Sequence, residues 1–81
     1  MADLSPERAE EIAARAWCDT LEISDADRTE NFFAAGGTSV LLAQLQRRLS
    51  AAYGFRFAMK DIFESPTVAG IAETALRRSA E

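Results

Sequence analysis

Residues 31–45 read NFFAAGGTSVLLAQL, and they combine a glycine pair, two hydroxyl side chains and an apolar run. Gly36-Gly37 stands directly before Thr38 and Ser39, and the apolar run follows at once. A hydroxyl at this point can accept a hydrogen bond from a backbone N–H two or three residues later and so begin a helix. The stretch therefore predicts a helix that starts near Ser39, and it leaves open which hydroxyl caps it. A helix cap is also the simplest role for Ser39 itself.

Catalytic roles for Ser39 lack the groups that they need. The chain has no histidine, which excludes Ser-His-Asp catalysis and every histidine-based metal site. A Ser-Lys dyad would have to use Lys60, the only lysine, and nothing in the sequence places Lys60 beside Ser39. The serine elbow G-x-S-x-G would need glycine where Leu41 stands. We therefore assign no catalytic residue and no metal site.

A phosphate is compatible with this stretch, although the P-loop motif G-x-x-x-x-G-K-[ST] is absent. The first N–H groups of a helix lack intrahelical partners, and the positive end of the helix dipole lies there. A phosphate attached covalently to Ser39 would lie in this field. The two glycines would keep the backbone narrow enough for a modifying enzyme to reach the hydroxyl.

The composition describes one small acidic domain. With 81 residues the chain forms a single domain, residues 1–81. The net charge of −4 is uneven, because residues 1–31 carry nine acids and three bases, whereas residues 32–81 carry four acids and six bases. No basic patch is large enough for nucleic acid, and no apolar run has the length of a signal peptide or a membrane span. We expect a cytoplasmic monomer without nucleic-acid or membrane partners.

Apolar periodicity and helix caps predict an all-α fold, a small four-helix bundle with three longer helices and one short helix. The first helix begins after Ser5, with Pro6 at its first position, and a polar loop follows it. The second helix covers residues 39–52 and ends before Gly54, a natural C-terminal cap. On this helix the leucines share one side, while Gln44, Gln46, Arg47 and Arg48 share the other.

The second half of the chain predicts a short helix near residues 59–64 and a last helix that Ser65 caps and Pro66 opens. The helical part of the domain then spans about residues 5–78. Its core is expected to contain these apolar side chains: Ile12, Trp17, Phe33, Leu42, Leu45, Leu49, Phe63, Val68, Ile71 and Leu76.

Three segments of the chain match one pattern in register: AWCDTL at residues 16–21, ENFFAAGGTSVLLAQLQRRL at residues 30–49 and DIFESPTVAGIA at residues 61–72. Together they resemble the peptidyl carrier proteins, the thiolation domains of nonribosomal peptide synthesis. The family pattern is roughly D-x-F-F-x-L-G-G-x-S-L, followed by F-x-x-P-T-x-x-x-L-A. The resemblance runs from about residue 10 to residue 76, and it implies an acyl-carrier-protein-like bundle.

The resemblance also implies a cofactor and a function. In this family the serine of G-G-x-S receives 4'-phosphopantetheine from coenzyme A through a phosphopantetheinyl transferase, so Ser39 takes that role. Gly36, Gly37 and Thr38 complete the attachment motif. The thiol of the arm then holds an aminoacyl or peptidyl group as a thioester and presents it to adenylation, condensation or other tailoring enzymes. The chain would thus be a carrier and not an enzyme.

Three positions depart from the family pattern. Glu30 stands where aspartate is common, which is a mild change. Ala35 replaces the leucine before the glycines and so shrinks an expected core contact. Val40 replaces the leucine after the serine, and we expect it to tune the choice of partner.

Acyl carrier proteins of polyketide or fatty-acid synthesis resemble this chain too, and they are the alternative. They usually have D-S-L where this chain has G-T-S-V, and their second helix is often acidic, whereas this one carries Arg47 and Arg48. These features favour the peptidyl class. An unmodified helical protein-interaction domain is the alternative from a different class.

A partner-binding surface is expected beside Ser39. Val40 is an apolar residue on a helical row that also holds Gln44 and Arg47. By the family's arrangement Met59 opens the short helix that flanks the same site, and a methionine adapts to several partners. We expect Val40 and Met59 to meet partner enzymes, and Arg47 and Arg48 to steer the encounter through charge. The alternative is that both apolar residues belong to the rim of the core.

Overall fold

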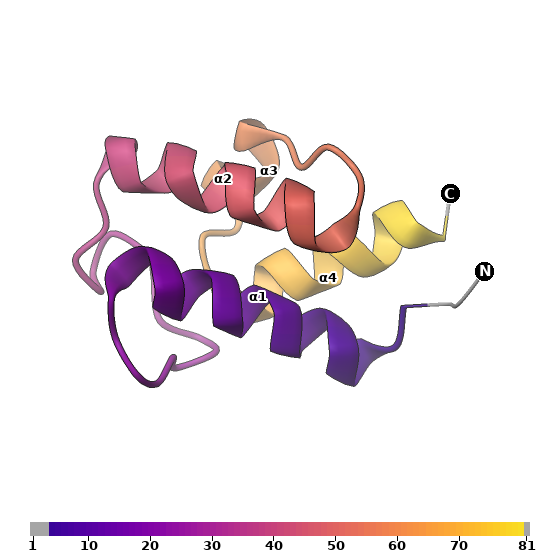
Figure 1. Ribbon diagram of the computed structural model, residues 1–81, viewed down its shortest axis with the longest axis horizontal. Helices are drawn as coiled ribbons and strands as arrows, with labels where there is room; N and C mark the ends of the chain where they lie inside the picture. The colour runs from indigo at the N-terminus through magenta and orange to yellow at the C-terminus, as the bar shows by residue number, and fades with distance from the viewer. Residues whose placement is uncertain (1–3, 81) are drawn as a thin grey trace.

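The structure, a computed structural model, describes residues 4–80 and contains four helices (Figure 1). They are α1 (Pro6–Leu21), α2 (Ser39–Tyr53), α3 (Met59–Glu64) and α4 (Val68–Ser79). Residues 4–80 form no strand. The predicted bundle of three longer helices and one short helix is therefore confirmed. No helix in this part of the chain is long and apolar enough to cross a lipid bilayer.

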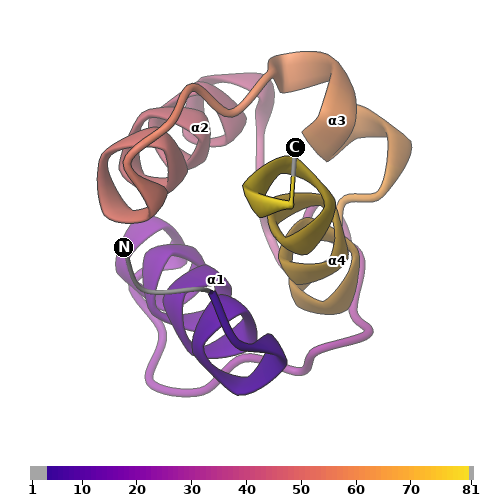
Figure 2. The same ribbon diagram turned by 90° about the vertical axis from the view of Figure 1, so that its right-hand side faces the viewer.

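The three longer helices lie lengthwise, and α3 lies across one side of the bundle (Figure 2). Helix α1 packs against both α2 and α4, while α3 packs against α2 and α4. Helices α1 and α2 run in opposite directions, so the end of α1 and the beginning of α2 share one end of the molecule (Figure 1). Ser39 consequently lies at the end of the bundle opposite the beginning of α1 and the end of α4 (Figure 1).

Local signals set the ends of α1 and α2 much as the sequence predicts. The hydroxyl of Ser5 accepts a hydrogen bond from the backbone N–H of Arg8 at 3.0 Å, and Pro6 occupies the first helical position. Helix α2 runs one residue further than expected, to Tyr53, and Gly54 caps it with φ +82°. That conformation suits a residue without a Cβ atom.

The predicted beginning of the last helix is wrong by two residues. Thr67, and not Ser65, caps α4, because its hydroxyl accepts from the backbone N–H of Gly70 at 2.9 Å. Ser65 instead ends α3, and its carbonyl oxygen accepts from the backbone N–H of Thr67. Pro66 therefore lies in the connection between the two helices. The sequence S-P-T offers two capping side chains that are two residues apart, and the structure uses the second, Thr67.

The core confirms six of the expected residues and corrects four. Trp17, Leu42, Leu45, Leu49, Val68 and Ile71 are fully buried. Phe33 and Phe63 are exposed, and their neighbours Phe32 and Ile62 are buried in their place. Ile12 and Leu76 are only half-buried. Phe32 and Phe33 are adjacent, as are Ile62 and Phe63. When one residue of such a pair fills the core, its neighbour must face the solvent.

Phe57 is a fully buried residue that the periodicity did not predict. Its backbone carbonyl accepts from Gln46 Nε2 at 2.7 Å, and its N–H donates to Ser50 Oγ at 2.9 Å. Gln46 therefore belongs to the inner side of α2, which corrects its expected place among the solvent-facing residues. Tyr53 packs on the Phe57 ring and donates its hydroxyl to the Ala9 carbonyl at 2.6 Å. These contacts fix the extended link between α2 and α3 onto the bundle.

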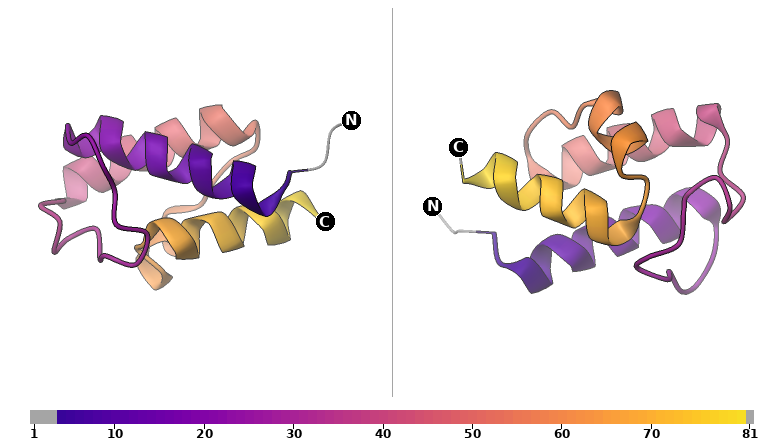
Figure 3. Two further views of the ribbon diagram at one scale, coloured as in Figure 1. Left: turned by 90° about the horizontal axis from the view of Figure 1, so that it is seen from below. Right: turned by 180° about the vertical axis from the view of Figure 1, so that it is seen from behind.

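The loop between α1 and α2 runs past the beginning of α4 (Figure 3), and bonds of Arg28 and Phe32 hold it to the bundle. The Arg28 guanidinium bonds both carboxylate oxygens of Glu10, at 2.8 and 2.9 Å, and this pairing lowers the pKa of Glu10. The Arg28 carbonyl accepts from Ala69 N, and Phe32 N donates to the Pro66 carbonyl, each at 2.8 Å. The loop is thus bound to α1 and to the beginning of α4.

Each glycine of the pair has its own structural reason: Gly37 makes room for Phe32, and Gly36 adopts a left-handed backbone conformation. The Phe32 ring meets Trp17 edge-on at 5.0 Å between centroids. A Cβ atom on Gly37 would overlap that ring and would lie 2.8 Å from the Phe32 carbonyl oxygen. Gly36 has φ +109°, a conformation that other residues rarely adopt. Asn31 closes the same turn, because its side-chain oxygen accepts from Phe33 N at 2.8 Å.

We predict that Leu45→Ala lowers the free energy of unfolding by about 2–5 kcal/mol, because it leaves a cavity in the closed core. Leu41→Ala on the same helix is the matched control. Leu41 is only half-buried, so the same truncation should cost clearly less. Chemical denaturation of both variants measures the difference. Equal costs for the two truncations would contradict the assigned orientation of α2.

We predict that Gly37→Ala lowers the free energy of unfolding by about 1–3 kcal/mol, since the buried Phe32 ring has no room to move away from the added methyl group. Ala34→Ser is the control, because Ala34 is exposed in the same turn and also gains one atom. Thermal melting by circular dichroism compares the two. A Gly37→Ala variant as stable as the control would show that Phe32 does not pack against this backbone.

Candidate functional site

Ser39 is the first residue of α2, and its side chain is exposed. The hydroxyl that caps this helix belongs to Thr38, whose Oγ1 accepts from the backbone N–H of Leu41 at 3.2 Å. Thr38 has the extended backbone of a cap residue, with φ −126° and ψ 173°. The Ser39 hydroxyl has no hydrogen-bond partner among residues 4–80. The question that the sequence left open is thus answered: Thr38 caps the helix, and Ser39 is free.

The charge around Ser39 suits an attached anion. The first N–H groups of α2 have no intrahelical partner, and they lie at the positive end of the helix dipole. Helix α1 places Glu7 in its first turn and α3 places Asp61 there, whereas the first turn of α2 has no acidic residue. The Thr38 hydroxyl pairs with the Leu41 N–H, so the N–H groups of Ser39 and Val40 are the ones left without a partner among residues 4–80. A phosphodiester on Ser39 would therefore lie near these two N–H groups, with no opposing carboxylate within that turn.

The attachment motif shapes the backbone around the serine. Gly36 and Gly37 allow the turn to close under Phe32, and Thr38 then begins the helix. These three residues act on the position of Ser39 through backbone geometry. A direct contact between them and phosphopantetheine stays a prediction.

Neither Cys18 nor a metal site competes with Ser39 within residues 4–80. Burial raises the pKa of the Cys18 thiol, and the carboxylates of Asp25 and Asp19 raise it further. A thiol with a raised pKa is a weak nucleophile at neutral pH. Within residues 4–80 no group of three or more acidic, cysteine or histidine side chains is arranged to hold a metal ion.

Val40 and Met59 differ in exposure. Val40 is 69% exposed, as the polar row on α2 predicts. Met59 is half-buried and packs against the core, which favours the rim alternative, and its contact with partner enzymes stays a prediction. The cause is that α3, which Met59 opens, is pressed against α2 and α4.

The two arginines also differ. Arg47 and Arg48 are both exposed, but Arg48 donates to the Thr20 hydroxyl of α1 at 3.1 Å. Arg48 thus leans across α2 toward α1. Arg47 makes no such contact and lies on the same row as Val40.

An exposed aromatic pair lies near the attachment turn, and the sequence analysis missed it. Phe33 comes from the glycine turn and is 38% exposed, while Phe63 comes from α3 and is 52% exposed. Their rings stack, with centroids 6.0 Å apart and planes 24° apart. The doublets Phe32-Phe33 and Ile62-Phe63 could have indicated this pair from the sequence. Only one residue of each doublet can face the core, so the other must be exposed.

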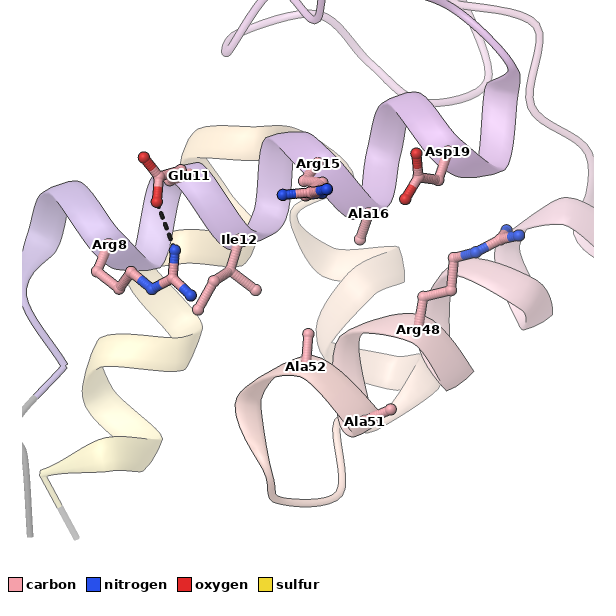
Figure 4. Close-up of a pocket in the computed structure, with 9 residues that line it drawn as sticks. All are labelled: Arg8, Glu11, Ile12, Arg15, Ala16, Asp19, Arg48, Ala51 and Ala52. Carbon is pink, nitrogen blue, oxygen red and sulfur yellow. Dashed lines mark hydrogen bonds and ion pairs between the residues drawn. The ribbon is translucent and has the colours of Figure 1, made fainter.

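A hollow of about 390 Å³ lies elsewhere, between α1 and α2 (Figure 4). Ile12 and Ala16 face Ala51 and Ala52 across it, and Arg8, which pairs with Glu11, closes one end. The small alanines leave Ile12 uncovered, which explains why that residue is only half-buried. None of residues 36–40 lines this hollow, and Ser39 is exposed on the surface.

The family model for the phosphopantetheine attachment site matches residues 11–75 of this chain. Tyrocidine synthase 2 of Brevibacillus parabrevis is 41% identical over 68 residues, which are 84% of this chain. The chain spans about 2% of the length of such relatives, so it corresponds to a small part of each synthase.

Solved structures agree with this assignment. A nonribosomal PCP domain is 31% identical with a TM-score of 0.72, and the match covers 80% of this chain and 83% of that one. A peptidyl carrier protein solved with the transferase Sfp and coenzyme A has a TM-score of 0.80 at 24% identity, with coverage of 86% and 91%, which supports the fold. The family match over residues 11–75 runs from within α1 to within α4 and includes the glycine turn. This chain therefore belongs to the phosphopantetheine attachment family and is a carrier domain.

Proposed function

We propose that Ser39 carries 4'-phosphopantetheine and that the arm holds aminoacyl or peptidyl groups as thioesters in nonribosomal peptide synthesis. The observation that carries this proposal is the exposed, unpaired hydroxyl of Ser39 at the first position of α2. It directly follows the turn that Gly36 and Gly37 make possible. The arm supplies the thiol, and the protein supplies attachment and presentation.

Attachment needs a second protein. Transfer forms a bond from Ser39 Oγ to phosphorus, breaks the bond from that phosphorus to the nucleotide half of coenzyme A, and releases the hydroxyl proton to a base. The chain has no histidine, and Ser39 makes no hydrogen bond to a basic group among the described residues. The base therefore belongs to a phosphopantetheinyl transferase, and this chain acts as its substrate and not as an enzyme. The solved carrier in complex with such a transferase supports this assignment.

Two features support the peptidyl class over acyl carriers of polyketide or fatty-acid synthesis. The matched relatives are peptide synthases, among them tyrocidine synthase 2. Helix α2 presents Arg47 and Arg48 on its surface, where acyl carriers often present acids. Loading by an adenylation enzyme with an amino acid separates the classes, because an acyl carrier would take a malonyl or fatty acyl group instead.

Partner enzymes are proposed to dock on exposed apolar side chains: Val40, which follows Ser39 on α2, and the stacked pair of Phe33 and Phe63. Exposed valine and paired aromatic rings in so small a domain mark an interaction site. Arg47 adds a positive charge to this surface and is expected to act mainly on the rate of encounter. Adenylation, condensation and tailoring enzymes are the expected partners. A monomeric state and a cytoplasmic location stay predictions.

We predict that a phosphopantetheinyl transferase with coenzyme A adds one phosphopantetheine to the wild-type chain and none to Ser39→Ala. Intact mass measures the addition. Ser24→Ala is the control, because Ser24 is exposed in a loop and does not follow a glycine pair. Full modification of Ser39→Ala would overturn the proposed attachment site. An unmodified wild-type chain would favour the interaction-domain alternative.

We predict that Val40→Thr and Phe63→Ala slow the transfer of cargo to or from partner enzymes about fivefold, the factor that corresponds to about 1 kcal/mol of lost contact. Both side chains are largely exposed, so melting temperature should change little. Threonine keeps the shape of valine and adds no charge near the phosphate. Ala51→Thr, three turns along the same helix, is the matched control. Loading rates equal to the control with every partner would remove this surface from the proposal.

A further inference from the structure

The beginning of α2 contains two hydroxyls that compete for one role. Thr38 and Ser39 are adjacent, and either side chain is chemically able to cap a helix. In the structure the Thr38 hydroxyl holds the Leu41 N–H at 3.2 Å, and the Thr38 carbonyl accepts from Leu42 N at 2.8 Å. Ser39 follows as the first helical residue, with its hydroxyl exposed and unpaired among residues 4–80.

This competition is a property of α2 within the described part of the chain. Ser5 caps α1 and Thr67 caps α4, but the residues after them are Pro6 and Val68, which have no hydroxyl. Helix α3 has no side-chain cap. Among the helices of residues 4–80, α2 is therefore the one in which the residue after the cap could replace it as the capping side chain.

A helix that began one residue later would make Ser39 the cap. Its hydroxyl would then accept from a backbone N–H in the first turn and would lie against the helix, as the Thr38 hydroxyl does now. In that position the Ser39 oxygen would face the helix and not the solvent, so a modifying enzyme could not reach it as easily. The residue at position 38 therefore decides whether the Ser39 oxygen is exposed to solvent or hydrogen-bonded to the helix.

We propose that Thr38 is a positioning residue for the modification of Ser39. By capping α2 it fixes the first helical residue at Ser39 and leaves the Ser39 hydroxyl free to react. Thr38 acts through Ser39 and need not touch coenzyme A or the transferase. The inference rests on the proposed function, because it concerns the reactivity of the proposed attachment residue.

The test compares Thr38→Ala with Thr67→Ala in steady-state modification of the full chain by a phosphopantetheinyl transferase and coenzyme A. The Thr67 hydroxyl caps α4 with the same bond, to Gly70 N at 2.9 Å, so its loss is a matched loss of helix stability. We expect kcat for Thr38→Ala to fall about fivefold with KM little changed, the factor that corresponds to a cap worth about 1 kcal/mol. Thr67→Ala should keep the wild-type kcat.

Two further variants distinguish positioning from stability. Thr38→Ser and Thr38→Asn restore a capping side chain and should restore kcat. A Thr38→Ala chain that is folded and modified at the wild-type kcat would overturn the inference, and so would equal losses in Thr38→Ala and Thr67→Ala. Either result leaves the proposed function intact as long as the wild type is modified at Ser39. A wild type that is not modified would overturn the proposed function and this inference together.

Discussion

The buried ring of Phe32 connects parts of the chain that lie far apart in sequence, and the geometry of the attachment site depends on it. The ring packs edge-on against Trp17 of α1, at 5.0 Å between centroids. The backbone N–H of the same residue donates to the carbonyl of Pro66, ahead of α4. Gly37 must lack a side chain because the ring occupies the space that a Cβ atom would fill. One buried aromatic residue thus holds the loop, the bundle and the glycine turn in a single arrangement.

The properties of Ser39 follow from where that turn ends. After this turn the backbone of Thr38 is extended, and this conformation allows the Thr38 hydroxyl to cap α2. Ser39 is then the first helical residue, at the positive end of the dipole and without an acidic neighbour in the first turn. A phosphate diester gains from that field, and an enzyme can reach a hydroxyl that no protein group holds. The fold thus leaves the proposed attachment serine exposed, and its hydroxyl has no hydrogen-bond partner within residues 4–80.

The surface around the serine is a consequence of how the core is filled. Phe32 and Ile62 point inward, so Phe33 and Phe63 point outward and stack on each other. Val40 is exposed because the buried leucines of α2 occupy the opposite side of that helix. The hollow between α1 and α2 has a different origin, since the small side chains of Ala51 and Ala52 fail to cover Ile12. Apolar exposure near Ser39 and apolar exposure in that hollow are therefore separate features.

The sequence by itself determined the helices, the attachment motif and the family. These features depend on residues that are close together in the sequence, so they can be recognised without knowing the fold. Examples are the cap formed by Ser5 with Pro6, the glycine at position 54 and the spacing of the leucines. The tertiary structure alone decided which phenylalanine of residues 32 and 33 is buried, whether Ser65 or Thr67 begins α4, and which hydroxyl caps α2. Each of these choices lies between neighbouring residues of nearly equal local preference. For Phe32, the contacts with the Trp17 ring and the Pro66 carbonyl supply the difference in free energy that local sequence does not.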